Sequence, residues 1–210
     1  MNDINACFIS YRHTNDAQAH TFVQAFVVQL KKQLSWLLPG IPVFFDEDGL
    51  KVGDQFNNEL ALQLCQSACM VMFFSPLHFD MHHPYCALEY QAMLRLEKQR
   101  LGKAIDDLRN KGLILPVVFR GLSYLPTEIS NARQYENFDH IVVASDFARR
   151  HCQIQIKKIA NQIFLRYKVQ SDAGVFNDIN CRHFNFPDKV EIEEWLIEVS
   201  QLRSFRMPGH

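Results

Sequence analysis

The sequence predicts an α/β domain in which a five-stranded parallel sheet is covered by helices on both faces. The first indication is a set of short apolar runs, rich in β-branched and aromatic residues, that have the length and composition of buried strands. The second is the stretches between these runs, where apolar residues recur at spacings of three and four, as in amphipathic helices. Strand and helix alternate five times along the chain, and this alternation indicates parallel strands joined by helical crossovers.

The first half of the chain supplies three strands and two helices. The apolar runs that we assign to strands are residues 6–11, 42–46 and 69–74. Apolar residues at helical spacing predict a helix over residues 19–37, and Pro39 and Gly40 end it. Asp54 can cap the second helix, which presents Leu60 and Leu64 on one face.

The second half continues the pattern. Pro84 suits the first turn of a third helix, because an N–H group at that position would have no partner in the helix. Residues 112–119 form the fourth strand, and Pro116 within it indicates an edge position or a local bulge. Residues 140–144 form the fifth strand, and residues 146–167 form the helix that follows.

These elements make up one domain, residues 1–168, for which a flavodoxin-like doubly wound sheet is the economical architecture. From residue 169 the alternation stops, and residues 169–210 form a C-terminal extension. The extension carries one amphipathic helix over residues 189–202. Its predicted apolar face consists of Val190, Trp195, Leu196, Val199 and Leu202.

Charge and cysteine content limit the partners and the compartment that we expect. The formal net charge is −1, so nucleic acid is not an expected partner. No apolar run approaches the roughly 20 residues that cross a bilayer, and the N-terminus has no secretory signal pattern. The six cysteines have irregular spacings and lie mostly in apolar runs. We therefore expect reduced thiols in a cytoplasmic protein that does not bind membranes.

Polar residues follow the expected strands at the edge where α/β proteins bind ligands, the carboxyl ends of the strands. The residues at this edge are Tyr11, Arg12, Asp46, Ser75, Cys86 and Glu89. Cys86 and Glu89 are three residues apart and therefore share a helix face. Type and position leave two interpretations of Glu89 equally open, a reactive carboxylate in a cleft and a solvated helix residue. Arg12 is either a phosphate ligand, because its guanidinium group is planar, or a surface charge.

The loop before the third helix contains three histidines close to Cys86. The spacing of His78, His82 and His83 relative to Cys86 matches no zinc pattern, so we expect a plain loop and no metal ion. As a catalytic thiol, Cys86 has no clear activating partner beyond His82 or His83. The sequence also lacks the P-loop, the dinucleotide-binding glycine motif and the nucleophile elbow of α/β hydrolases.

Four short motifs together resemble a known family. They are FISYR at residues 8–12, FFDEDGLKVGD at 44–54, FFSP at 73–76 and YCALE at 85–89. Each falls at the end of an expected element, and together they look like a Toll/interleukin-receptor (TIR) domain. The resemblance covers roughly residues 4–168, and it is to the bacterial NAD⁺-cleaving type of the family, Thoeris-like or a related defence TIR. It implies the same flavodoxin-like fold that the alternation predicts.

The resemblance implies an enzyme that cleaves NAD⁺ at the nicotinamide–ribose bond, with NAD⁺ as the substrate and no further cofactor. The family's catalytic glutamate ends a Trp-Cys-x-x-Glu motif, and that position is Glu89. The cysteine of the motif matches Cys86, and Tyr85 replaces its tryptophan. The family's aromatic–basic pair after the first strand matches Tyr11 and Arg12.

The same resemblance extends to the rest of the substrate site and to assembly. The remaining residues expected at the substrate are Phe45, Asp46 and Ser75. Phe45 or Tyr85 is expected to stack on a ring of the substrate. The loop after the second strand, residues 47–53, often contacts a neighbouring protomer in this family. Its expected assembly residues are Asp48, Gly49, Leu50 and Lys51.

Two functions from different classes compete. The first is an NAD⁺ nucleosidase that gives nicotinamide and ADP-ribose, or a cyclic or conjugated ADP-ribose signal, in bacterial antiviral defence. It implies a separate sensor or effector protein, because no sensor domain is attached. The second is a non-catalytic module that signals by TIR–TIR assembly. Glu89 at the catalytic position favours the enzyme. A receiver-like or flavodoxin-like binding domain is a weaker third interpretation, because no acidic cluster follows the first strand.

Overall fold

A computed structural model describes residues 4–13, 17–46, 54–101, 108, 111–177 and 180–204, with the backbone alone for residues 54–56 and 200–204. Five parallel strands form one sheet in the order β2-β1-β3-β4-β5. The strands are β1 (Cys7–Tyr11), β2 (Val43–Phe44), β3 (Met70–Phe74), β4 (Ile114–Val118) and β5 (Glu136–Asn137). This is the flavodoxin-like strand order, and it confirms the predicted fold class.

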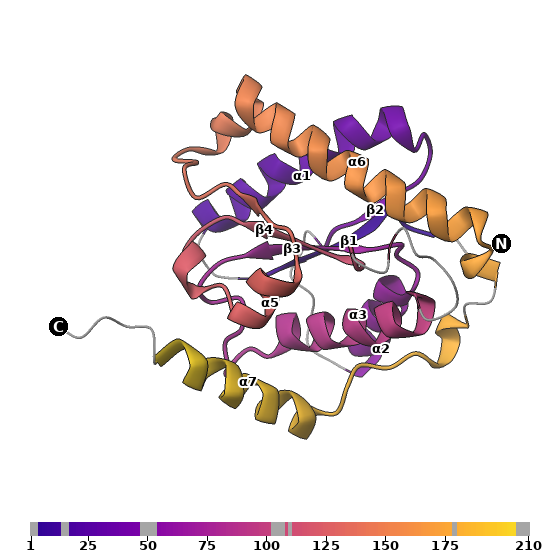
Figure 1. Ribbon diagram of the computed structural model, residues 1–210, viewed down its shortest axis with the longest axis vertical. Coiled ribbons are helices and arrows are strands. Elements are labelled where there is room, and N and C mark those ends of the chain that lie inside the picture. The colour runs from indigo at the N-terminus through magenta and orange to yellow at the C-terminus, as the bar shows by residue number, and fades with distance from the viewer. Residues whose placement is uncertain are drawn as a thin grey trace.

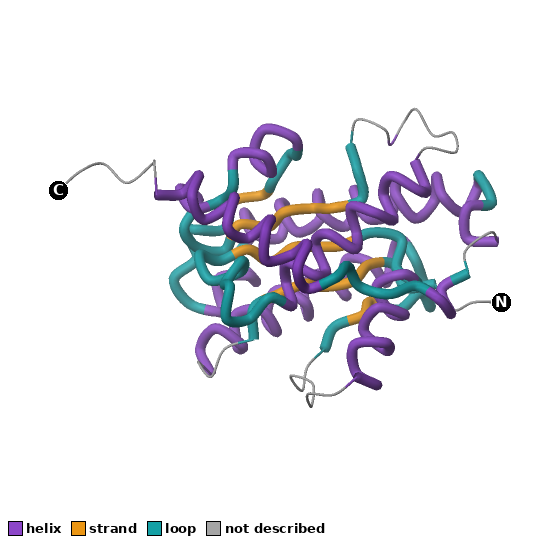
Figure 2. The backbone as a smooth tube through the Cα atoms, turned by 90° about the horizontal axis from the view of Figure 1, so that it is seen from below, coloured by secondary structure: helices purple, strands orange, loops and turns teal. Residues whose placement is uncertain are grey.

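Helices cover both faces of the sheet (Figure 1). They are α1 (Ala17–Leu37), α2 (Asp54–Cys65), α3 (Tyr85–Leu101), α5 (Thr127–Ala132), α6 (Arg150–Asp172) and α7 (Lys189–Ser204). Helices α1 and α6 pack together on one face, and α2 and α3 pack together on the other. Helix α7 lies against α3, farther from the sheet. Figure 2 shows the strands between the two layers of helices. No helix among the described residues is long and apolar enough to cross a membrane.

Both faces of the sheet are apolar because both are covered. Every residue of β1, β3 and β4 is buried. Between the sheet and the layer of α1 and α6, the Phe26 ring centroid lies 5.3 Å from that of Phe73. The same ring lies 5.9 Å from Phe138 and 5.8 Å from Phe147. Aromatic rings at such separations favour tilted or edge-to-face packing, which Phe26 makes with all three neighbours.

The fifth strand lies earlier in the chain than predicted. Strand β5 is Glu136–Asn137, whereas residues 140–144 lead through a turn into the 3-10 helix η2 (Ala144–Ala148). The Asp146 carboxylate accepts hydrogen bonds from the backbone N–H groups of Val142 and Val143, at 3.1 Å each. The prediction of a strand was therefore wrong, because a capping carboxylate competes for the backbone donors that a strand would need. Helix α6 correspondingly begins later than predicted, after η2.

Pro116 lies within β4, which has neighbours on both sides and a continuous register with β3, so neither the predicted edge position nor a bulge is found. Alternate residues of a parallel strand bond to opposite neighbours. The Phe119 N–H donates to β3, and the Val118 carbonyl accepts from the β5 side, so the Pro116 nitrogen faces the β5 side. Since β5 pairs only with the last two residues of β4, the missing N–H group removes no sheet hydrogen bond.

The C-terminal extension packs on the domain through an aromatic cluster and an ion pair. The Trp195 ring of α7 lies 5.0 Å from the Phe79 ring and 5.4 Å from the Tyr90 ring. Arg95 of α3 and Glu191 of α7 form an exposed ion pair with 2.5 Å between Nη2 and Oε2. Exposed ion pairs contribute little to stability, so the aromatic cluster is the stronger part of this contact.

The apolar face of α7 differs from the predicted face at two positions, Val190 and Ile192. Leu196 and Val199 are buried, as predicted, and Ile192 is buried with them. Val190 is 62% exposed, so its predicted place in the contact was wrong. The buried residues follow the spacing of three and four, and Val190 precedes Ile192 by two residues, on a different side of the helix. The side chain of Leu202 lies outside the described residues.

Cys65 and Cys181 form a disulfide between the end of α2 and the extension, so the prediction of reduced thiols was wrong for this pair. The other four cysteines are free and buried, as predicted. The paired residues are 116 positions apart, and only the three-dimensional fold brings them together. The bond holds the segment that leads into α7 against the domain.

We expect Cys181→Ser to lower the free energy of unfolding by about 2–4 kcal/mol, because the unfolded chain loses a cross-link that closes a long loop. Urea denaturation without a reducing agent measures this difference. A reducing agent is expected to bring the wild type to the stability of the variant and to leave the variant unchanged. A wild type whose stability does not respond to the reducing agent would contradict a stabilising role for the bond.

Candidate functional site

Glu89 lies in the second turn of α3 and points back at the sheet. Its side chain is buried, with 7% of the residue exposed. The Ser10 hydroxyl of β1 donates a hydrogen bond of 2.5 Å to Glu89 Oε2. The helix is aimed this way because it starts at Tyr85, directly after Pro84 and close to the end of β3. The carboxyl group is therefore enclosed between a helix and a strand and is not a solvated helix side chain.

Burial raises the pKa of Glu89 from 4.5 to about 8. The Ser10 hydrogen bond lowers the pKa, and the nearby Asp46 carboxylate raises it further. Loss of hydration outweighs one hydrogen bond here, so the group holds its proton at neutral pH in this state of the molecule. A cation placed beside it would reverse this balance and favour the carboxylate.

Successive residues of β1 point to opposite faces of the sheet, and this separates the predicted residues into two groups. Ser10 faces α3 and Glu89, whereas the Tyr11 ring faces α1, with its centroid 6.4 Å from that of His20. The Tyr11 hydroxyl donates a hydrogen bond of 2.6 Å to the main-chain oxygen of Asp46. The rings of Tyr11 and Phe45 lie 5.2 Å apart. Tyr11, Phe45 and Asp46 thus meet at the ends of β1 and β2.

Arg12 returns to the Glu89 side of the sheet. Its Nη2 lies 3.4 Å from Asp80 Oδ2 in the loop before α3, and its Nη1 donates to the main-chain oxygen of His13. Its buried Nε atom has no hydrogen-bond partner among the described residues. A buried donor without a partner is costly, and an anionic ligand would satisfy it.

Cys86 lies one helical turn before Glu89 and is buried on the same side of α3. Burial raises the pKa of its thiol well above the usual value, and the Glu89 charge raises it further, whereas Arg12 lowers it. A thiol in this setting keeps its proton and is a poor nucleophile. Cys86 therefore acts as a small, uncharged side chain that packs beside the Glu89 carboxyl group.

Ser75 and Tyr85 are half-buried at the two ends of the loop between β3 and α3. The main-chain oxygen of Ser75 accepts a hydrogen bond of 2.9 Å from the His78 N–H, which starts the first turn of this loop. His78 is fully buried against Phe74, whereas His82 is exposed. The predicted assembly residues Asp48, Gly49, Leu50 and Lys51 lie outside the described residues.

Three residues of the site were missed by the sequence analysis. Ser10 carries the hydrogen bond to Glu89, and Asp80 pairs with Arg12. His13 Nε2 lies 3.6 Å from Asp46 Oδ2, and burial lowers the pKa of this histidine although Asp46 raises it. A polar residue inside an apolar strand was the available signal for Ser10. Asp80 and His13 carried no such signal, because both lie in polar loops.

A cavity of about 330 Å³ lies elsewhere, between β4, α5 and α6, and none of the predicted site residues lines it. Four of the charged side chains that line it, those of Arg133, Glu136, Lys158 and Arg166, have partners within the protein. Arg133 pairs with Glu97, Lys158 pairs with Glu136, and Arg166 donates to main-chain oxygens. The candidate functional site is therefore the one around Glu89, where a buried carboxyl group with a strongly shifted pKa lies beside the ends of the strands.

The sequence was compared with protein-family models, with curated proteins and with solved structures, and only the family models gave a match. A model of the TIR domain family matches residues 7–151, which run from β1 to the start of α6 and include every site residue described above. No curated protein and no solved structure gives a significant match.

We expect Glu89→Gln to remove a pH dependence of stability. The folded protein holds the Glu89 proton up to about pH 8, whereas the unfolded chain loses it near pH 4.5. Wild-type stability therefore falls as pH rises between these values, by up to about 1.4 kcal/mol for each pH unit. The variant lacks this pH dependence, so its free energy of unfolding rises relative to that of the wild type between about pH 4.5 and pH 8. Urea denaturation from pH 4 to pH 9 measures the difference, and parallel curves would contradict the shifted pKa.

Proposed function

The chain belongs to the TIR domain family, and we propose that it cleaves the bond between nicotinamide and ribose in NAD⁺, with Glu89 as the catalytic residue. TIR domains include NAD⁺-cleaving enzymes and signalling modules, and they commonly self-associate. The enzyme is the better supported of the two here. The observation that carries it is the buried Glu89 carboxyl group beside the end of β1, with its pKa near 8.

The proposed reaction needs only one carboxylate. When the C1′–N bond breaks, the bonding electron pair leaves with the nicotinamide nitrogen, and the pyridinium becomes a neutral molecule. No general acid is required for this leaving group, in contrast to ordinary glycosidases, which usually use two carboxyl groups. The positive charge moves to the ribose, and the Glu89 carboxylate stabilises it or holds the ribose hydroxyl groups. The oxygen of water or of a hydroxyl group of the same substrate, or another acceptor, then forms a bond to C1′, and a water or hydroxyl acceptor gives up its proton in this step.

The raised pKa of Glu89 links ionisation to substrate binding. The nicotinamide ring of NAD⁺ carries a positive charge, which would lower the pKa of a carboxyl group next to it. Glu89 would then release its proton only when the substrate is in place. The Ser10 hydroxyl keeps one carboxyl oxygen fixed, so the other oxygen is the one available to the ribose.

The neighbouring residues have proposed roles that follow from their positions. The Nε donor of Arg12 has no partner in the part of the chain that the structure describes, and its guanidinium group suits the diphosphate. Tyr85, at the start of α3 and in place of the family's tryptophan, offers a ring for stacking. Phe45 offers a second ring, with Asp46 beside it, whereas Tyr11 points to the opposite face of the sheet from Glu89 and holds the ends of β1 and β2 together. Ser75 lies at the end of β3, on the rim of the proposed site.

A non-catalytic TIR–TIR signalling module is the second candidate. The full enclosure of Glu89 and the pairing of Arg12 with Asp80 favour it, because both groups already have partners in the single chain. Self-association through residues 48–51 is compatible with both the enzyme and the signalling module. In the enzyme, assembly would open the site around Glu89, which is closed in the single chain. We propose that a separate sensor or effector protein triggers this assembly in antiviral defence.

The proposed substrate also implies a compartment. NAD⁺ is an intracellular dinucleotide, so we propose that the protein acts in the cytoplasm, and the four free cysteines agree with this. The disulfide is the feature that does not fit a reducing compartment. Cys65 and Cys181 are only 2% and 5% exposed, so the attack of thiol reductants on the bond is slow while the protein stays folded and becomes fast once it unfolds.

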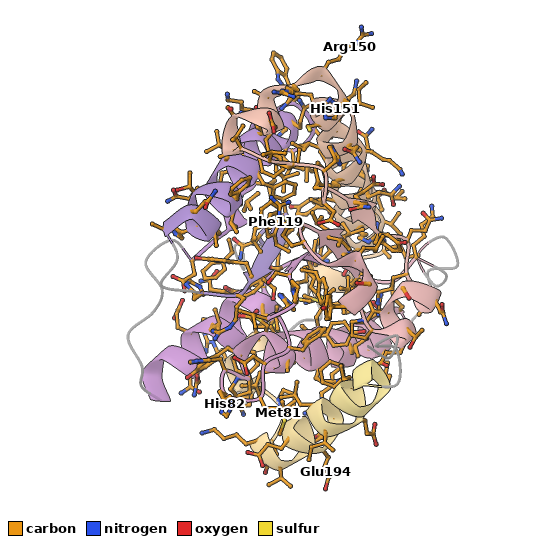
Figure 3. All side chains as sticks on the ribbon, turned by 90° about the vertical axis from the view of Figure 1, so that its left-hand side faces the viewer. Met81, His82, Phe119, Arg150, His151 and Glu194 are labelled. Carbon is orange, nitrogen blue, oxygen red and sulfur yellow. A yellow bond between two sulfur atoms is a disulfide. The ribbon has the colours of Figure 1, made fainter. Side chains whose placement is uncertain are left out.

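Purified protein at high concentration, with a crowding agent to promote assembly, is expected to release nicotinamide from NAD⁺. Glu89→Gln keeps the shape of the side chain and removes the charge, so turnover is expected to fall on the order of 10²-fold or more. Release of nicotinamide measured by chromatography gives the rate. Glu194→Gln on α7 is the matched control, because it removes an exposed glutamate on the outer helix (Figure 3).

Equal turnover by the wild type and by Glu89→Gln would contradict the role of Glu89. Release by neither protein, although sedimentation shows that the wild type has assembled, would contradict the enzyme and support the signalling module.

Ser10→Ala is expected to lower kcat/KM by about 10- to 100-fold, because a hydrogen bond to a charged group contributes about 1.5–3 kcal/mol. Loss of this bond also raises the pKa of Glu89, so the variant needs a higher pH to reach its maximum rate. The pH profile of kcat/KM measures both effects. A lower rate with an unshifted profile would show that Ser10 acts only on folding or packing.

A further inference from the structure

Two histidines and a cysteine meet outside the proposed NAD⁺ site, where the turn after β5 reaches the first turn of α6. His140 comes from the turn, and His151 and Cys152 are the second and third residues of α6. His140 Nε2 lies 3.9 Å from Cys152 Sγ, and the two imidazole rings lie 5.2 Å apart. One nitrogen or sulfur atom from each residue lies within 4.8 Å of the other two.

Rigid parts of the fold hold these three residues. The Asp146 carboxylate fixes the turn through two backbone N–H groups, and the fully buried Phe138 stacks on His140 with ring centroids 6.3 Å apart. Cys152 is buried at the start of a helix of 23 residues. The two histidines are exposed, so their rings can turn toward a ligand without disturbing the core.

We propose that His140, His151 and Cys152 bind a zinc ion, with a water molecule in the fourth coordination position. Zinc prefers imidazole nitrogen and thiolate sulfur in a tetrahedral arrangement, at about 2.0–2.1 Å and 2.3 Å respectively. These bond lengths put the ligand atoms about 3.3–3.6 Å from one another. His140 Nε2 and Cys152 Sγ, 3.9 Å apart, are already close to this separation, and no pair of ligand atoms is more than 4.8 Å apart. Small rotations of the two exposed rings can close the remaining distance. Two exposed ligands leave one side of the ion open to solvent.

The surroundings of the cysteine suit a bound cation. A bound metal ion supplies the positive charge that a thiolate needs, and the α6 N-terminus favours the same state. Sulfur and imidazole ligands also favour zinc over magnesium or calcium, which take oxygen ligands.

The sequence predicted no metal ion, because the histidines that lie close together along the chain are those near Cys86, and His140 was expected within a strand. His140 and Cys152 are twelve residues apart and come together through the turn that replaces this strand. The site lies at the side of the molecule where Figure 3 labels His151, far from His82 and Glu194. It stabilises the junction of β5, η2 and α6 and does not depend on the proposed reaction.

Titration of tag-free protein with Zn²⁺, followed by calorimetry, tests the proposal. The wild type is expected to bind one ion per chain and to melt at a higher temperature with zinc present. His140→Ala and His151→Ala are each expected to weaken binding by at least about 10- to 100-fold, since even loss of an outer-shell partner costs this much. Titration with Co²⁺ adds a spectroscopic readout, because a sulfur-to-cobalt absorption band is expected in the wild type and not in Cys152→Ser.

His183→Ala is the matched control, because it removes an exposed histidine of the extension. It is expected to bind zinc like the wild type. Circular dichroism without metal checks that each variant is folded, and the exposed His151 supplies a folded variant if Cys152→Ser does not fold. A wild type that binds no zinc, or a His151→Ala protein that binds it with unchanged affinity, would overturn the proposal.

Discussion

Parallel pairing of β1 with β2 and β3 is the constraint on which the site depends. It brings the carboxyl ends of these strands to one edge of the sheet, so residues far apart in the chain become neighbours. Ser10 and Arg12 come from one strand end and Asp46 from the next. Helix α3 starts at the same edge and adds Glu89. Any doubly wound domain brings polar residues together at this edge of the sheet. The chemistry that such a site can perform depends on the types of these residues.

The environment of Glu89 divides into a stabilising and a destabilising part. One hydroxyl group stabilises the carboxylate, and the surrounding apolar residues and the Asp46 charge destabilise it. Together, these effects raise the pKa of Glu89 and favour its protonated form in the single chain. Active sites often contain groups that the fold holds in an unfavourable state of ionisation, and the unfavourable part is offset by packing elsewhere. The aromatic contact of α7 with α3 contributes to this offset.

The fold was largely predictable from the sequence, and the site was predictable in part. Short continuous apolar runs located β1, β3 and β4, because these strands are buried on both faces. The same criterion failed at residues 140–144, where the capping carboxylate of Asp146 decides the backbone conformation. The spacing of three residues correctly predicted that Cys86 and Glu89 lie on the same face of α3. The Ser10 bond and the disulfide depend on distances between segments remote in sequence. Strand alternation puts Ser10 and Tyr11 on opposite faces of the sheet, but only the packing of α3 decides which of the two faces Glu89.

The disulfide between Cys65 and Cys181 closes the intervening chain into a covalent ring. This ring contains β3, β4, β5, α3 and α6, and therefore most of the sheet and Glu89. A protease that cuts the backbone once within it leaves a single covalent molecule, whose two pieces separate only after reduction. After backbone cleavage in a surface loop of the ring, the protein would thus keep its apparent mass on a non-reducing denaturing gel, and two smaller pieces would appear only after reduction. The fold can in this way survive a nick that would divide an uncrosslinked chain of the same topology.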